Sequence, residues 1–323
     1  MAFGFWFMVH SCLFGVAVCR FVRARIGQNG ANSLFNPLKP ASKVQRPAFN
    51  IFEYSVSLHL SAKFDCMALF KSGNPTLTEK MFDRAQQASA DNAGVMSIRG
   101  TINKFGFLML MVVAGAAYTW NLYMQEKPQT AMTLMIVGAI GGLITGLIIS
   151  FKPNWAGYLA PAYGILQGLF IGAISVVINS MFAEKYPGIV MQAVGLTFGV
   201  AIAMFLLYNF RVIQATQKFK AVVMTATLGI ALFYLITWIV SLFGVNMPFM
   251  SITNGGMLGI GISLFVVAIA ALNLILDFDM IERGAEAGAP KFMEWYGAFG
   301  LLVTIVWLYV EMLKLLSRLA SRD

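Results

Sequence analysis

The acidic side chains in the last third of the chain are the residues best suited to chemistry. Five of them lie close together in the sequence, namely Asp277, Asp279, Glu282, Glu286 and Glu294. A sixth, Glu311, lies within an apolar stretch near the C-terminus. Placing a carboxylate in hydrocarbon costs about 3 kcal/mol on insertion scales. Such a group therefore faces the interior of a helical bundle, pairs with another group, or binds a proton because lost hydration disfavours the charged form.

Asp277 and Glu311 are the two acids most in need of such an explanation. Asp277 ends an apolar run, and Asn273 lies one turn earlier on the same face of the expected helix. A simpler interpretation of Asp277 is a helix end that meets water. A simpler interpretation of Glu311 is a side chain that extends to the outer membrane surface. The sequence leaves these alternatives open.

Composition identifies the surroundings of these acids as lipid. The chain is 59% apolar and 11% charged, whereas soluble domains are about 45–50% apolar and about 25% charged. Several charge-free runs reach the length of about 20 residues that a helix needs to cross the hydrocarbon. We therefore expect an all-α polytopic membrane protein, a bundle of seven transmembrane helices. The expected spans are about 105–123, 132–150, 157–178, 188–208, 221–243, 256–277 and 297–316.

The first 66 residues differ from the rest of the chain. An apolar stretch is followed by three arginines and then by a segment rich in Gly, Asn and Pro. The alternatives are an extra membrane anchor, a transit peptide, or an upstream region translated from a start set too early, with Met67 as the true start. We favour the last of these. The expected order is a doubtful extension (1–66), a cytoplasmic segment (67–104), the membrane domain (105–317) and a short tail (318–323).

The distribution of basic residues predicts the orientation. If residues 67–104 are cytoplasmic, eleven lysines and arginines from residue 67 onward lie on that side and five on the other. Cytoplasmic loops carry the excess of Lys and Arg, so this assignment is favoured. Seven spans then place the C-terminus outside, where Lys314, Arg318 and Arg322 fit poorly. A re-entrant last segment is the alternative.

Several kinds of chemistry are excluded from the expected bundle. All three cysteines and both histidines precede residue 67. The bundle therefore has no thiol nucleophile, no disulfide, no zinc site built on Cys or His, and no histidine base. We expect no enzyme activity and no bound cofactor. The net charge of +9 reflects the basic cytoplasmic loops rather than a nucleic-acid partner.

Glycines recur at helical spacing in two of the expected spans. Gly138, Gly142 and Gly146 lie in the second span, and Gly168 and Gly172 lie in the third. Small residues at this spacing let helix backbones approach closely in lipid. We expect these glycines to serve helix packing only.

Longer motifs resemble a known family. The segment Leu274–Gly288, LILDFDMIERGAEAG, resembles the end of the sixth helix of the Bax inhibitor-1/YccA-like (TMBIM) membrane proteins, where an FDTQ signature precedes an acidic AExG stretch. Leu308–Leu313, LYVEML, resembles their last-helix LYLDFI, and Tyr163–Ser175 resembles their third helix. The stretches GTINK, YPGI and GAPKFMEWYGAFGLL are similar to the bacterial Bax inhibitor 1-like branch. The resemblance covers about residues 100–318.

The resemblance implies a calcium leak channel in the bacterial inner membrane. In that family, two aspartates on the last two helices share a proton and gate the pore with pH. By motif they match Asp277 and Glu311, a transient site for calcium or protons, with Asn273, Asp279 and Glu294 in support. Two close carboxylates cannot both ionise cheaply, so one keeps a proton. Oxygen ligands also suit Ca²⁺.

The chain departs from the family pattern at this site. The second acid is a glutamate, and Phe278-Asp279 replaces the "TQ" of the signature. The second span contains no Lys or Arg, where some members place a basic partner. Asp277 and Glu311 are 34 residues apart, so a close pair requires the sixth helix to continue past Asp277.

Two other functions compete with conduction. One is a membrane scaffold or stress-response protein that carries no ions. The other, less favoured, is an intramembrane aspartyl protease, because Leu276-Asp277-Phe278-Asp279 matches neither motif of those enzymes.

Overall fold

The computed structural model describes residues 94–244, 251 and 255–322. The predictions for residues 1–66 and for most of the segment 67–104 lie outside this part of the chain. The described helices are α4 (Ile98–Met124), α5 (Pro128–Phe151), η2 (Pro153–Trp155), α6 (Ala156–Phe182), α7 (Ile189–Asn209), α8 (Gln217–Leu242), α9 (Met257–Glu286) and α10 (Met293–Ala320). All but the short η2 are long and apolar enough to cross a membrane, so the predicted all-α fold with seven transmembrane helices is confirmed.

The helices alternate in direction through the bundle. The start of α10 meets the start of α4, where Glu294 accepts hydrogen bonds from Ser97. The opposite end of α10 meets the start of α9, where Arg318 donates to the carbonyl of Gly259. We call these the Ser97 end and the Arg318 end of the bundle. The Ser97 end is the one predicted to face the cytoplasm.

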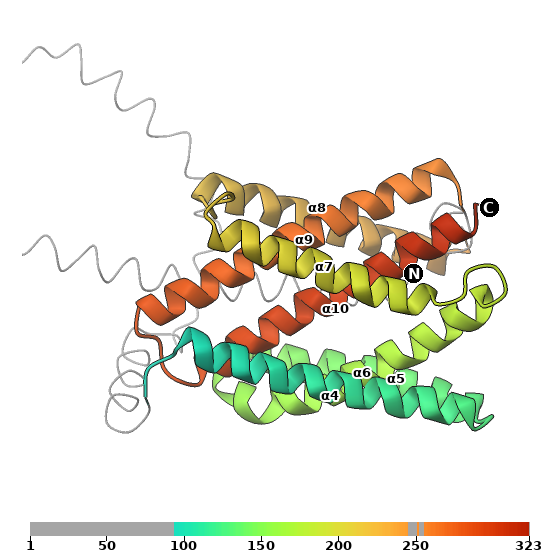
Figure 1. The fold of residues 1–323 in the computed structure, drawn as a ribbon, viewed down its shortest axis with the longest axis horizontal. Helices are drawn as coiled ribbons and strands as arrows, with labels where there is room; N and C mark the ends of the chain where they lie inside the picture. Colours follow the sequence, from blue (N-terminus) through green and yellow to red (C-terminus); the bar gives the residue numbers. More distant parts are fainter. Residues whose placement is uncertain (1–93, 245–250, 252–254, 323) are drawn as a thin grey trace, which may run out of the picture. The chain divides into compact units, whose positions relative to one another are not determined.

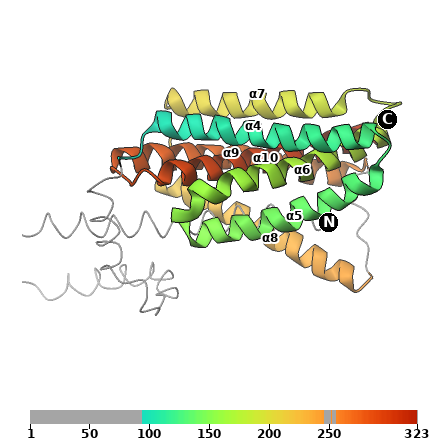
Figure 2. The same cartoon turned by 90° about the horizontal axis from the view of Figure 1, so that it is seen from below.

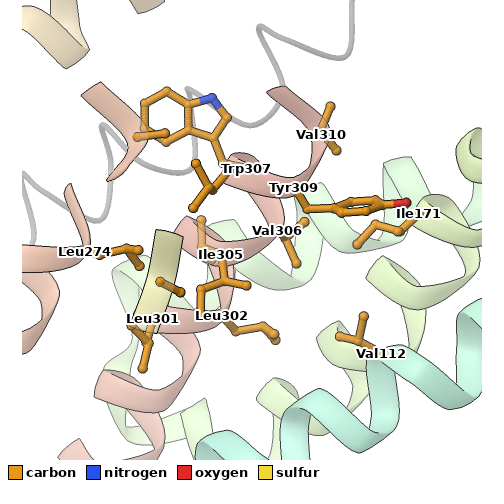
Figure 3. Close-up of a cluster of buried hydrophobic side chains, with 14 of the residues drawn as sticks. Val112, Ile171, Leu274, Leu301, Leu302, Ile305, Val306, Trp307, Tyr309 and Val310 are labelled. Carbon is orange, nitrogen blue, oxygen red and sulfur yellow. The ribbon is translucent and has the colours of Figure 1, made fainter. Parts of the chain in front are cut away.

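Helix α10 is the central helix. It passes between α4 and α6 on one side and α7 and α9 on the other (Figures 1 and 2). In its most apolar stretch 89% of the residues are buried by protein, compared with 22% in α4. Figure 3 shows Leu302, Val306 and Tyr309 of α10 among side chains of α4 and α6. Polar residues of α10 therefore face other helices rather than lipid.

Helices α4, α5 and α6 pack backbone to backbone. A Cβ atom added to Gly172 of α6 would lie 2.7 Å from Cα of Ala116 in α4. A Cβ atom at Gly138 of α5 would lie 2.5 Å from the carbonyl oxygen of Leu166 in α6. Only glycine permits these approaches, which agrees with the packing role predicted for the glycine stripes.

Helix α9 continues beyond the predicted end of its span. The apolar run stops at Asp277, but the helix reaches Glu286 and ends before Gly288, whose φ is +62°. Hydropathy marks where a helix leaves lipid, whereas the backbone continues as long as its charged side chains find partners. The continuation that a close acid pair would require is therefore present.

Candidate functional site

The supporting candidate Glu294 ties two helices together at the Ser97 end. Its Oε1 accepts hydrogen bonds from the backbone amide and the hydroxyl of Ser97, at 2.9 and 3.0 Å. Its Oε2 forms an ion pair with Lys104 of α4. Ser97 is also the N-cap of α4, because its hydroxyl accepts from the amide of Gly100. Glu294 is thus fully occupied in holding α10 against α4.

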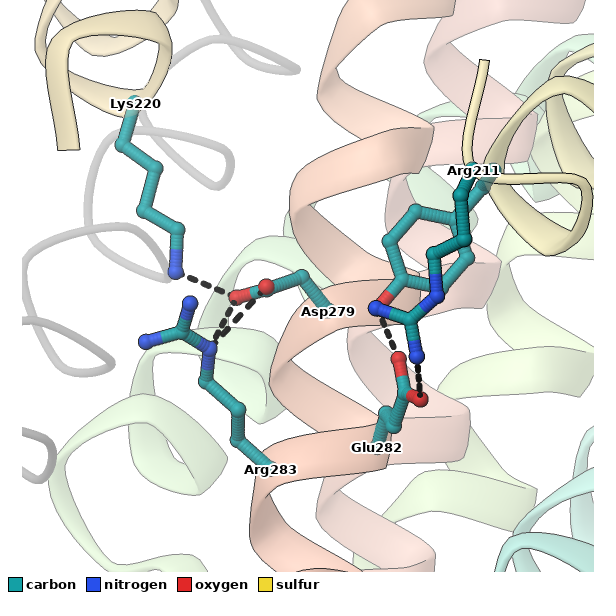
Figure 4. A network of polar contacts seen from close by, with 6 residues as sticks. Arg211, Lys220, Asp279, Glu282 and Arg283 are labelled. Atoms are coloured by element: carbon teal, nitrogen blue, oxygen red, sulfur yellow. Dashed lines mark hydrogen bonds and ion pairs between the residues drawn. The ribbon is translucent and has the colours of Figure 1, made fainter. Parts of the chain in front are cut away.

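Two further acids of α9 join neighbouring helices at the same end (Figure 4). Asp279 pairs with Lys220 of α8 and, at 3.0 Å, with Nε of Arg283 one turn along α9. Glu282 pairs with Arg211 at 2.8 Å and accepts from the hydroxyl of Tyr208 at the end of α7. The acids around the α9–α10 connection therefore form a set of ion pairs that fastens α7, α8 and α9 to one another.

Asp277 differs from these acids because it has no basic partner among the described residues. Its side chain is buried, with 5% of the residue exposed, so the helix-end interpretation is wrong. The side chain of Thr304 in α10 lies close to this carboxyl, while its hydroxyl donates to the carbonyl of Gly300 one turn earlier on its own helix. Its Oδ2 atom has no hydrogen-bond partner in the described part of the protein. A lone carboxyl thus lies between α9 and the central helix.

Glu311 lies inside the bundle and not at its surface. None of the residue is exposed, so the interpretation that it extends to the outer membrane surface is wrong. Lys314, three residues later in α10, donates to its Oε1 at 2.8 Å. The hydroxyl of Tyr234 in α8 lies 3.5 Å from its Oε2. Glu311 therefore has a counter-ion, whereas Asp277 has none within residues 94–244, 251 and 255–322.

Asp277 and Glu311, the two acids predicted to form a pair, lie at different heights along the axis of α10. Asp277 contacts Thr304, and Thr304 precedes Glu311 by seven residues, or about 10 Å of helix. No described hydrogen bond joins the two carboxyls. A proton shared between Asp277 and Glu311 therefore stays a prediction.

Asn273 supports the surroundings of Asp277. Its amide nitrogen donates to the hydroxyl of Thr227 in α8 at 2.9 Å and to the carbonyl of Ile269 at 2.8 Å. This contact ties α8 to α9 one turn from Asp277.

These contacts line up into a polar column between α8, α9 and α10. Each level of the column is a pair of residues from two of these three helices, and the levels follow one another from the Ser97 end to the Arg318 end. In order they are Lys220–Asp279, Asp277–Thr304, Asn273–Thr227, Tyr234–Glu311 and Arg318–Gly259. The column reaches from one end of the bundle to the other.

A regular spacing in the sequence places the members from α8 on one face of that helix, and those from α10 likewise. Lys220, Thr227 and Tyr234 are each seven residues apart on α8, and Thr304, Glu311 and Arg318 are each seven apart on α10. Residues seven apart lie two turns apart on the same helix face. Sequence reasoning focused on the acids and missed Tyr234, Thr304 and the basic partners, although this spacing was a signal for them.

Acidic groups do not gather densely anywhere in the column. Among residues 94–244, 251 and 255–322, no group of three or more His, Cys, Asp or Glu side chains is placed to hold a metal ion. A cation passing along the column would meet one carboxylate at a time, together with hydroxyl, amide and carbonyl oxygens.

Comparison with known proteins places the chain in a family. The family described as Bax inhibitor 1 like matches residues 74–321, more than three quarters of the chain. No curated protein and no solved structure matches the chain.

Proposed function

Because the chain belongs to the Bax inhibitor 1 like family, we propose that it is a pH-sensitive calcium leak channel whose ions move along the polar column. The observation that carries the proposal is Asp277, a buried carboxyl without a described counter-ion within this column. Ionisable groups within membrane helices are costly, and they often mark pathways for ions or protons. We also propose that the membrane is the bacterial inner membrane, with the Ser97 end in the cytoplasm.

The charges of the column favour Asp277 as the pH-sensitive group. Glu294, Asp279 and Glu311 each have a basic partner, which offsets their negative charge. Loss of a proton from Asp277 would instead place an uncompensated negative charge between α9 and α10. That charge would attract a cation to the level of Asp277 in the column. We therefore expect calcium flux to rise as the pH rises.

In the family mechanism the two acids share a proton, and we propose a modified form of this mechanism. Asp277 and Glu311 lie about 10 Å apart along α10, so direct sharing requires a movement of α9 against α10. A cation that moves along the column couples the two acids without such a movement. A cation drawn to an ionised Asp277 would next meet Glu311 on its way to the Arg318 end.

Liposomes containing the purified full-length chain and a calcium indicator test the proposal. We expect a calcium flux that increases between about pH 6 and pH 8, where a buried acid can titrate. Asp277→Asn should abolish the pH dependence. Glu286→Gln is the matched control, because Glu286 lies on the same helix but is exposed. A flux that is absent, or equally pH-dependent in Asp277→Asn, contradicts the proposal.

A scaffold that carries no ions is the second candidate. The ion pairs at the Ser97 end favour it, because they fasten α7, α8 and α9 to one another and α4 to α10 as a static structure would require. It predicts that replacing both Asp277 and Glu311 leaves ion flux unchanged. We propose no enzyme activity, because an aspartyl protease requires two adjacent carboxyls, whereas Asp277 and Glu311 lie about 10 Å apart along α10.

A further inference from the structure

We propose that Lys152 and Trp155, at the connection between α5 and α6, form a binding site for an anionic phospholipid. The lysine binds the phosphate of the headgroup, and an acyl chain lies along the exposed face of α5. This inference does not depend on conduction, because it concerns the outer surface of the bundle rather than the polar column.

Lys152 differs from the other basic side chains that lie over an aromatic ring. In the described part of the chain there are four such side chains. Three of them also have a carboxylate partner, namely Lys104 with Glu294, Arg211 with Glu282 and Lys314 with Glu311. The Nζ of Lys152 lies 5.0 Å from the centre of the Trp155 ring, but it forms no ion pair with any described residue. The ring therefore holds the amine in place, and the positive charge is left for an anion from outside the chain.

Lys152 lies where two apolar helices reach the edge of the membrane. Helix α5 ends at Phe151, and α6 begins at Ala156 after the short η2. A Cβ atom added to Gly157 would lie 3.5 Å from the Trp295 ring at the start of α10, so this connection belongs to the Ser97 end of the bundle. A lysine directly after an apolar span lies at the depth of the lipid headgroups.

Three aromatic residues near Lys152 in the sequence are exposed. Phe151 is 70% exposed, Trp155 53% and Tyr158 88%. Tryptophan and tyrosine concentrate at the boundary between membrane and water, where the ring contacts lipid and the N–H or O–H group reaches the headgroups. The surface thus offers the Lys152 amine together with the Trp155 indole N–H and the Tyr158 hydroxyl as donors to a phosphate.

The exposed face of α5 provides a path for an acyl chain. Ile140 and Ile144 are 55% and 53% exposed and lie four residues apart, and the exposed Phe151 follows seven residues after Ile144. Residues at these spacings share one face of a helix, so this apolar face leads from Lys152 toward the middle of the membrane. A soluble anion would contact the lysine alone, whereas a phospholipid would contact the lysine and the apolar face together.

The charge of the site selects among phospholipids. The headgroup of phosphatidylcholine carries a cation that cancels the charge of its phosphate, whereas phosphatidylglycerol is a net anion. We therefore expect phosphatidylglycerol to bind in preference to phosphatidylcholine. Native mass spectrometry should show that Lys152→Gln retains about fivefold less phosphatidylglycerol than wild type, the effect of one basic side chain near an anionic lipid surface.

Lipid-dependent stability of the purified full-length chain in detergent tests the site a second way. We expect phosphatidylglycerol to raise the midpoint of thermal unfolding by about 3 °C more than phosphatidylcholine does, because a ligand that binds only the folded state stabilises it. Lys152→Gln should lose this difference, Trp155→Leu should reduce it, and Lys152→Arg, which keeps the charge, should retain it. Lys127→Gln is the matched control and should behave like wild type, since Lys127 is also exposed and also directly precedes a proline, at the other end of α5.

Each of the opposite results overturns the proposal. An equal preference for phosphatidylglycerol in Lys152→Gln would place the lipid elsewhere on the bundle. Equal stabilisation by the two lipids would show that charge does not select the ligand. Stabilisation by inorganic phosphate that is as large as that by phosphatidylglycerol, and is lost in Lys152→Gln, would identify a soluble anion as the ligand. Because Lys152 is exposed, its substitution removes no core contact, and the variants should fold like wild type.

Discussion

Glu294 accepts two hydrogen bonds from Ser97, one from the backbone amide at 2.9 Å and one from the hydroxyl at 3.0 Å. The same carboxylate pairs with Lys104, so the first turns of the central helix and of α4 meet at one buried acid. Glu294 is 3% exposed in its side chain and Lys104 is 18% exposed. This junction makes a specific prediction about stability.

Lys104→Met should destabilise the chain by about 3 kcal/mol, because it leaves a buried carboxylate without its counter-ion. The double variant Lys104→Met with Glu294→Leu should recover part of that loss, since an apolar pair of similar size often replaces a buried ion pair without cost. Thermal unfolding in detergent measures both. Lys127→Met, at an exposed lysine, is the control and should unfold like wild type. A loss that is as large in the double variant would show that Glu294 acts through Ser97 alone.

Asp277 makes a prediction about the pH dependence of stability. Ionisation of this carboxyl places a negative charge without a described counter-ion between α9 and α10. The folded chain should therefore bind the proton better than the unfolded chain, and stability should fall as the pH rises through the titration. We expect the midpoint of unfolding to fall as the pH rises above about 4, where the aspartate of the unfolded chain loses its proton, and Asp277→Asn to reduce that fall. A wild-type stability that is flat, or that rises over this range, would mean that another group dominates.

The seven helices could be predicted from the sequence, whereas the partners of the acidic side chains could not. A helix that crosses lipid must be apolar along its whole length, so hydropathy marks each span. Partners such as Lys220 for Asp279 lie on other helices, 59 residues away in this case. The spacing of residues along one chain segment carries no information about which two helices meet. The basic partner missing from the second span is supplied to Glu311 by Lys314 of its own helix, whereas Asp277 has none among the described residues.

The motif match does not decide whether Asp277 or Asp279 corresponds to the aspartate of the family signature. The family signature begins with Phe-Asp, and this chain has Phe-Asp at Phe278-Asp279. Asp279 therefore fits those two letters better than Asp277 does. The structure gives the two acids different surroundings, since Asp279 pairs with two cations and Asp277 with none among the described residues. Letters alone do not distinguish a paired acid from a lone one, because the difference lies in the neighbouring helices.

The backbone contact between α4 and α6 predicts a strong effect of a larger residue. A Cβ atom at Gly172 would lie 2.7 Å from Cα of Ala116, a distance at which the two helices must separate. Gly172→Val should lower stability by about 2 kcal/mol or more, in line with overpacked sites in protein cores. Gly195→Ala in α7 is the matched control, because no heavy atom lies within 4 Å of its added Cβ. Equal thermal unfolding of the two variants would contradict the close packing.

The distribution of basic residues predicts the orientation in the membrane, and chemical labelling tests this prediction. The Ser97 end carries the larger share of Lys and Arg, so it should face the cytoplasm. Lys218 lies exposed just inside the start of α8 at that end, and Lys185 lies exposed after α6 at the other. In a chain whose native cysteines are replaced by serine, Lys185→Cys should react with a membrane-impermeant maleimide in intact cells.

Lys218→Cys should react with that reagent only after the cells are permeabilised. Arg322→Cys, exposed just after α10, should behave like Lys185→Cys, because α10 runs from the Ser97 end to the Arg318 end. The reverse pattern at all three sites would show that the bundle is inverted. Protection of Arg322→Cys alone would favour a re-entrant last segment, and it would place Lys314 and Glu311 on the cytoplasmic side of the barrier.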